Sequence, residues 1–204
     1  MKKLILIRHG NTPKADRTPQ RGLTKAGVRK IIESSRRIRK ELDNIKSCLI
    51  ISTPTNRTRQ TADLLSSELG LMKQDVDDLR IHNLGNISAE LDRIKMANGN
   101  LCEYYWKIDS YEQNGVESPV NFTKRVDIIL SRYFEKGFDC LIVVTHEISL
   151  ETIVKYSKKY VLKRKSFDAV TDYGDFAIFE SKSSRHADQW PRRAFYGVRM
   201  SGAR

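Results

Sequence analysis

Three short apolar runs stand out in the pattern of hydrophobic and polar positions along the chain. They cover residues Leu4–Ile7, Cys48–Ile51 and Cys140–Val144. Continuous apolarity over the length of a strand, without alternation, is typical of strands buried on both faces of a parallel sheet. Polar residues follow each run directly, so the pattern predicts three buried strands that end sharply.

Amphipathic stretches lie between these runs and predict helices. Thr24 is a favoured N-cap, and the apolar stripe after it predicts a helix that continues to about Ile45. Another helix is expected to begin at Ser118-Pro119, where proline suits the first turn. Further helices are expected over 56–69, over about 88–97 and after residue 146, and further strands near 75–79 and 176–179. The remainder of 70–114 is expected to be irregular.

Strands that alternate with helices predict a three-layer α/β/α sandwich with a mostly parallel central sheet. The length of 204 residues is that of one ordinary domain. We expect this domain to span residues 1–180 and to be followed by a basic C-terminal extension over 181–204. The extension carries six basic residues and one acidic residue.

The charge balance favours anionic partners. Lysine and arginine number 37 against 25 acidic residues, which gives a net charge of +12. Such a surplus suits nucleic acid, phosphorylated protein or small phosphates. In the extension, Trp190, Phe195 and Tyr196 lie among arginines and could stack on bases, although packing against the domain is the favoured interpretation.

Other compositional features narrow the cellular setting. The N-terminal apolar run is too short for a signal peptide or a membrane span, so we expect a cytoplasmic protein with no membrane partner. The three cysteines are too few and too scattered to predict disulfides or structural zinc.

Chemically active side chains follow the three predicted strands. Arg8-His9 follows the first strand, Arg57 lies shortly after the second, and His146-Glu147 follows the third. Ligands of open parallel sheets bind beyond the carboxyl ends of the strands, so these three groups can meet at one site. Arginine forks match phosphate geometry, and a neutral histidine is a nucleophile that can take a phosphoryl group. The pattern therefore indicates a phosphate pocket in which cationic side chains take the place of a metal ion.

Rival signatures for phosphate or hydrolytic chemistry are missing from the sequence. It contains no GxxxxGK[ST] loop, no HExxH helix and no GxSxG turn. The pocket of histidines and arginines is therefore the main candidate for the chemistry of this chain.

Four segments, in the same order, resemble the motifs of the histidine phosphatase superfamily. They are Leu6–Thr12 with its Arg-His-Gly triplet, Gly22–Gly27, Ser52–Ala62 and Val143–His146. A fifth segment, Gly115–Ser118, resembles a Gly-Glu-Ser helix start in the branch that contains the mutases. The resemblance implies a phosphoglycerate mutase-like fold and no cofactor.

The same resemblance implies roles for individual residues. His9 would be the nucleophile that becomes phosphorylated, and Arg8, Arg57 and His146 would hold the phosphoryl oxygens. Asn11 and Thr12 would reach the substrate, although ordinary polar loop residues fit these two positions equally well.

One departure from the family pattern concerns the general acid. The branch usually carries a glutamate where this chain has Ile81, and isoleucine cannot donate a proton. Either no acid is used, as in the bacterial phosphohistidine phosphatases, whose loop before Thr24 is similar, or the acid comes from elsewhere. Glu147 follows the second histidine, where the acid phosphatases and phytases carry their acid, but the dipole of a helix N-terminus also favours an acidic residue there. His82 is a weaker substitute and otherwise a surface residue.

The sequence thus predicts a metal-independent phosphatase that works through phosphohistidine at His9. Its substrate would be a phosphomonoester on a small molecule or the phosphohistidine of a phosphoprotein. One alternative is a mutase-type phosphotransferase. The other is a non-catalytic module that binds phosphate or, less favoured, nucleic acid. The sequence leaves the natural substrate and the oligomeric state undetermined.

Overall fold

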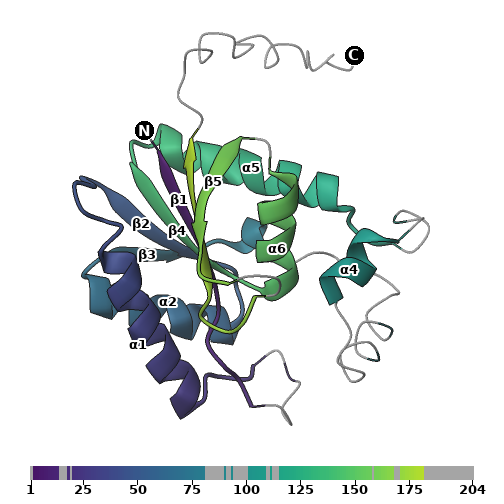
Figure 1. Ribbon diagram of the computed structural model, residues 1–204, viewed down its shortest axis with the longest axis horizontal. Coiled ribbons are helices and arrows are strands. Elements are labelled where there is room, and N and C mark those ends of the chain that lie inside the picture. The colour runs from purple at the N-terminus through teal and green to yellow at the C-terminus, as the bar shows by residue number, and fades with distance from the viewer. Residues whose placement is uncertain are drawn as a thin grey trace, which may run out of the picture.

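The computed structural model describes residues 2–13, 18, 20–80, 90, 93, 101–108, 111, 115–157, 159–167 and 171–181. Within these ranges six strands form one sheet in the order β3-β2-β4-β1-β6-β5 (Figure 1). The strands are β1 Lys3–Arg8, β2 Cys48–Ser52, β3 Met72–Asp75, β4 Cys140–Thr145, β5 Tyr160–Lys165 and β6 Phe176–Ser181.

The sheet is mostly parallel, as predicted. The neighbouring pairs β3-β2, β2-β4 and β4-β1 are parallel, whereas β6 runs antiparallel to β1 and to β5. Arg8 of β1 pairs with Thr145 of β4, and Ser52 of β2 pairs with Val144. The carboxyl ends of the three central strands therefore lie at the same edge of the sheet.

Helices cover both faces of the sheet and complete the predicted three layers (Figure 1). The helices α1 Lys25–Arg39 and α2 Asn56–Leu69 cover one face, and α5 Pro119–Glu135 and α6 Glu147–Tyr156 cover the other. Ile5 of β1 faces α1 and α2, and its neighbour Leu4 faces α5 and α6. Because successive side chains of a strand point to opposite faces, a continuous apolar run serves two cores.

The predicted helix starts are confirmed by their caps. The Thr24 hydroxyl accepts a hydrogen bond of 3.0 Å from the backbone N–H of Gly27. Ser118 caps α5 in the same way, and Pro119 is the first residue of that helix. Side-chain oxygens at these positions satisfy backbone N–H groups that have no partner inside the helix. The helix predicted over 56–69 is confirmed as α2.

The prediction that the first helix continues to Ile45 was wrong, since α1 ends at Arg39. Beyond it the chain forms tight turns, in which the N–H of Leu42 bonds to the carbonyl of Arg39 and that of Ile45 bonds to Leu42. Asn44 takes a positive φ of 65°. Leu42 and Ile45 still pack against the core, so the apolar stripe continues although the helix does not.

Three further differences concern the polar parts of the chain. The strand expected near 75–79 is β3 at Met72–Asp75, and Asp77–Leu79 form a short 3-10 helix, η1. A helix, α4 Leu101–Trp106, lies in the segment expected to be irregular, and β5 was not predicted.

The helix predicted near 88–97 lies outside the described residues, except for Glu90 and Arg93, which are helical. Residues 182–204 of the predicted extension also lie outside them. Among the helices in the described ranges, none has the length and apolarity needed to cross a membrane.

Candidate active site

The ends of the central strands bring together four of the predicted site residues. Arg8 is the last residue of β1 and His9 follows it, while His146 follows β4 and caps α6. Arg57 is the second residue of α2, which begins just after β2. The four side chains are only 5% to 9% exposed, and the rings of His9 and His146 lie 5.1 Å apart. The predicted meeting of these residues at one edge of the sheet is therefore observed.

The environment of His9 leaves one ring nitrogen free of a proton. Nδ1 lies 2.8 Å from the carbonyl oxygen of Gly10, and only a protonated nitrogen can donate to that acceptor. Nε2 therefore carries a lone pair, which accepts a hydrogen bond of 3.1 Å from Nε of Arg57. Burial lowers the pKa of His9 to about 3, and the charges of Arg57 and Arg8 contribute. His9 is therefore a neutral imidazole around pH 7.

His146 is held in the opposite tautomer. Nη2 of Arg57 donates to Nδ1 of His146 at 3.1 Å, so the proton of this ring is on Nε2. That nitrogen lies 3.2 Å from the hydroxyl oxygen of Thr53. Burial lowers the pKa of His146 well below its usual range, and the charges of Arg57 and Arg8 lower it further. Arg57 thus bridges two neutral histidines.

Arg57 stays a cation in this position. Burial and the charge of Arg21 lower its pKa to about 10, which is still above neutral pH. The site therefore keeps a buried positive charge between two uncharged rings.

The guanidinium of Arg8 is fixed by contacts from two sides. Nη2 lies 2.6 Å from a carboxylate oxygen of Glu147, and Nη1 donates to the carbonyl oxygen of Thr171. The ring of Tyr173 covers the guanidinium at 4.2 Å from its centroid to Cζ. The buried Nε of Arg8 has no hydrogen-bond partner in the part of the chain that the structure describes. Arg8 therefore keeps one buried donor unsatisfied among the described residues.

Glu147 is thus brought to the predicted site, where it pairs with Arg8. It is the first residue of α6, and the positive end of a helix dipole stabilises a carboxylate there. In this arrangement the side chain accepts hydrogen bonds and acts as a counterion. A proton donor must carry a proton, so catalysis by Glu147 requires that this ion pair loosens first.

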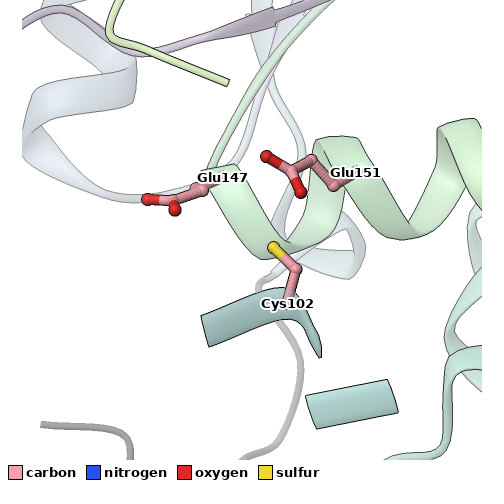
Figure 2. Close-up of side chains that lie close together, drawn as sticks. All are labelled: Cys102, Glu147 and Glu151. Atoms are coloured by element: carbon pink, nitrogen blue, oxygen red, sulfur yellow. The ribbon is translucent and has the colours of Figure 1, made fainter. Parts of the chain in front are cut away.

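A second carboxylate lies one turn further along α6. Figure 2 shows Glu147 and Glu151 on α6 and Cys102 on the neighbouring α4, with its sulfur atom directed toward α6. Glu151 accepts hydrogen bonds from the backbone N–H of Thr171 at 2.8 Å and from its hydroxyl at 2.6 Å. Burial, together with the charge of Glu151 and a hydrogen bond to it, raises the pKa of the Cys102 thiol.

This cluster has the spacing of a metal site but not the donor chemistry. The ligand atoms of its three residues lie within 4.8 Å of one another. A cysteine binds a metal ion as a thiolate, whereas Cys102 is held as a neutral thiol. Both carboxylates already bind donors of the protein, namely Arg8 and Thr171. We therefore assign the cluster to the support of Arg8 and of the segment around Thr171.

Of the three predicted substrate-binding residues, the structure describes Asn11 and Thr12 but not His82. Asn11 is half-buried, and its carbonyl oxygen accepts hydrogen bonds from the backbone N–H and the hydroxyl of Thr24. Thr12 is buried beside it in the same loop. Both lie directly after His9-Gly10, so a role in substrate binding stays a prediction. His82 and Ile81 lie outside the described residues.

Two residues of the site were missed in the sequence. The charge of Arg21 lowers the pKa of His9, Arg57 and His146, which puts a third arginine within electrostatic reach of the pocket. Its position directly before the Gly22–Gly27 motif was an available signal. Tyr173 contacts Arg8, and its ring lies 5.6 Å from that of His9. A single tyrosine in a loop gave no comparable signal.

The fold and the pocket define an α/β protein whose cationic, histidine-containing site lies at the carboxyl edge of its sheet. The chain belongs to the histidine phosphatase superfamily, since the model of branch 1 of that family matches residues 4–185. This family membership confirms the resemblance seen in the motifs and makes the chain a phosphomonoester hydrolase by class. A comparison with curated proteins finds no match.

Several solved structures have a similar fold. A mycobacterial glucosyl-3-phosphoglycerate phosphatase is 19% identical with a TM-score of 0.55, over 76% of this chain and 78% of its own. A phosphoserine phosphatase from Entamoeba histolytica is 20% identical with a TM-score of 0.54, over 76% and 78%. The product of an open reading frame of Mycobacterium tuberculosis is 17% identical with a TM-score of 0.59, over 90% and 93%. At these identities the likeness supports the phosphoglycerate mutase-like fold alone.

Proposed function

We propose that the protein is a metal-independent phosphatase that forms a phosphohistidine on His9. The lone pair of Nε2 attacks the phosphorus atom, a bond forms between nitrogen and phosphorus, and the ester oxygen leaves with its electron pair. Water then attacks the phosphorus, the nitrogen–phosphorus bond breaks, and inorganic phosphate is released. The observation that carries this proposal is the tautomer of His9, whose unprotonated Nε2 faces Arg57 in a buried pocket.

Arg57 changes its hydrogen-bond partners when substrate binds. Its donors bind the lone pairs of His9 and His146, and both contacts are hydrogen bonds to neutral acceptors. A phosphoryl dianion is a stronger acceptor, because charge-assisted hydrogen bonds are roughly twice as strong as neutral ones. Substrate binding therefore draws Arg57 onto the phosphoryl oxygens and frees Nε2 of His9 for attack. Arg8 and His146 complete the proposed set of phosphoryl ligands.

Glu147 is the proposed proton donor for the leaving group. Its carboxylate is balanced by Arg8 in the resting site. When a dianion takes the donors of Arg8, the carboxylate loses its counterion and faces a negative charge, and both changes favour its protonated form. Glu147 can then give that proton to the departing oxygen. A substrate with a good leaving group does not need this step.

The substrate class follows from the same pocket. Buried arginines and neutral histidines suit the dianion of a phosphomonoester, and a protein phosphohistidine is the second candidate, because Ile81 stands where the branch carries its acid. The similar mycobacterial and amoebic structures are phosphatases, which supports a phosphatase over a mutase. Three free cysteines suit a reducing compartment, so we keep the cytoplasm as the proposed location.

The test is to trap the phosphorylated enzyme. After brief incubation with a 32P-labelled phosphomonoester and an alkaline quench, label is expected on His9, and acid treatment should release it because the N–P bond is acid-labile. His9→Ala should abolish both labelling and the turnover of an aryl phosphate. His186→Ala, which removes a histidine of the extension, should leave both unchanged. Label on a serine, or turnover that survives His9→Ala, would overturn the proposal, and a wild-type protein without turnover would favour the non-catalytic module.

A further inference from the structure

Tyr173 occupies a place in the pocket that the proposed mechanism does not use. Its ring covers the guanidinium of Arg8 and lies 5.6 Å from the ring of His9, at an angle of 51°. The side chain is only half-buried, although its neighbours Arg8 and His9 are buried. Tyr173 is therefore a half-buried neighbour of two buried site residues.

The loop that carries Tyr173 is fixed at both ends. Before it, Thr171 is bonded through its N–H and its hydroxyl to Glu151, the buried carboxylate of α6 (Figure 2). After it, the N–H of Gly174 donates to the carbonyl of Arg8 at 3.1 Å, and its carbonyl accepts from the hydroxyl of Ser34 at 2.8 Å. These bonds hold the backbone on both sides of Tyr173, and the contact with Arg8 places its ring.

Gly174 makes this close approach possible. Its φ is +74°, a conformation that L side chains rarely adopt, and a Cβ atom there would lie 2.9 Å from Cγ of Lys30. The loop therefore lies directly against α1. The tight turn places Tyr173 over Arg8 because Gly174 is bonded to the backbone of that residue.

The side chain of Tyr173 lies within reach of three residues of the site: its ring contacts Arg8 and His9, and it acts electrostatically on Arg57. Burial lowers the pKa of Arg57 and Tyr173 raises it, so the hydroxyl of Tyr173 lies within electrostatic reach of that guanidinium. The hydroxyl makes no hydrogen bond to any residue in the described ranges. An O–H donor that lies near two arginines and has no partner is a group that an anionic ligand can satisfy.

We propose that Tyr173 is a phosphoryl-binding residue, whose hydroxyl donates a hydrogen bond to a phosphoryl oxygen while its ring holds Arg8 in place. This inference rests on the proposed function, since it assumes that the phosphoryl group lies between His9 and Arg57. The contact acts on the phosphorus side of the scissile bond. Its contribution is therefore independent of which alcohol leaves, unlike that of Glu147.

The experiment separates the hydroxyl from the ring. Tyr173→Phe keeps the ring over Arg8 and removes the O–H, whereas Tyr173→Leu removes both. For Tyr173→Phe we expect about 10-fold weaker binding of orthovanadate, and a fall of about 10-fold to 100-fold in kcat/KM for alkyl and aryl phosphates alike. Tyr173→Leu should lose more. Tyr156→Phe removes a hydroxyl at the far end of α6 and should match the wild type.

Two results would overturn the proposal. One is unchanged vanadate affinity and kcat/KM in Tyr173→Phe. The other is a fall in kcat/KM confined to alkyl phosphates, which would show that the hydroxyl contacts the leaving oxygen instead of a phosphoryl oxygen. Vanadate affinity is measured by titration calorimetry, so it tests Tyr173 even if the protein does not turn over. A wild type that binds vanadate without turnover would refute the proposed phosphatase alone, and one that binds no oxyanion would refute both.

Discussion

At the scale of single residues, the chemistry depends on which ring nitrogen of each histidine carries the proton. The Gly10 carbonyl fixes Nδ1–H of His9, and Thr53 fixes Nε2–H of His146. Both remaining lone pairs face Arg57, which can only donate. Three side chains thereby define a nucleophile and its neighbour before a substrate is bound, and burial keeps both rings neutral.

A leaving-group series tests the proposed role of Glu147. General acid catalysis is typically worth 10²–10⁴-fold and matters most when the departing oxygen is strongly basic. Glu147→Gln keeps the shape of the side chain and cannot donate a proton as a carboxyl does. We expect kcat for an alkyl phosphate to fall about 100-fold or more, and kcat for nitrophenyl phosphate to change little.

A matched control for this series is Glu117→Gln. Glu117 is also a glutamate near a helix N-terminus, since it lies directly before Ser118, the N-cap of α5, and it pairs with Arg125 at 2.7 Å with similar exposure. This pair lies outside the pocket, so its loss should leave kcat unchanged for every substrate of the leaving-group series. Equal and small losses for both esters in Glu147→Gln would contradict the role as acid and would favour a phosphohistidine substrate, whose leaving group needs less help.

The sequence was sufficient to predict those site residues that directly follow buried strands. Arg8, His9 and His146 could be predicted because an apolar run fixes where its strand ends, and the sheet fixes where those ends meet. Tyr173 could not, since its position depends on bonds from Gly174 and Thr171 to distant parts of the chain. The pairing of Glu147 with Arg8 likewise depends on side-chain geometry that spacing does not contain.

At the scale of elements, the strands buried on both faces were predicted closely, whereas the edge strand β3 was predicted with shifted bounds and the edge strand β5 was missed. β1, β2 and β4 are continuous apolar runs because helices cover them on both sides. All four residues of β3 are exposed, and five of the six residues of β5 are exposed. Edge strands are commonly polar and charged because such residues prevent edge-to-edge association. Their sequence therefore resembles that of a loop.

The start of α1 gives a test of how an element holds the catalytic loop. A Cβ atom on Gly27 would lie 2.4 Å from the backbone oxygen of Asn11, which cannot move without shifting the loop after His9-Gly10. Overpacking of this kind typically costs about 1–3 kcal/mol. For Gly27→Ala we expect that loss in the free energy of unfolding, measured by urea denaturation, together with a fall of at least 10-fold in kcat.

Gly70→Ala is the control for this prediction. Gly70 caps the far end of α2 with a φ of +70°, and a Cβ atom there meets nothing within 4 Å. The strain of the left-handed conformation should cost about 1–2 kcal/mol in stability. The activity of the remaining folded protein should match the wild type. A Gly27→Ala variant with normal kcat would show that α1 does not set the position of the loop.

At the scale of the whole molecule, the site places unusual demands on stability. Arginines and two neutral histidines lie buried together in a chain with a net charge of +12. The cations are compensated locally, by Glu147 for Arg8 and by ring nitrogens for Arg57. The histidines are held neutral against their natural tendency to protonate in mild acid. The free energy of unfolding should therefore depend on pH through these residues.

The sign and size of that dependence follow from His9. Its pKa is about 3 in the folded protein and about 6.5 in the unfolded chain, so between these values only the unfolded state binds the proton. The free energy of unfolding therefore keeps its full value above pH 6.5. It falls as the pH falls, by about 2 kcal/mol at pH 5 for this residue alone. The lowered pKa of His146 acts in the same direction. Between pH 7.5 and pH 5, we expect the free energy of unfolding to fall by about 2 kcal/mol less in His9→Gln than in the wild type. Urea unfolding of both proteins at both pH values measures the two changes. Carboxylates titrate equally in both proteins, so the difference between the two losses isolates His9, and equal losses would show that His9 protonates normally in the folded state.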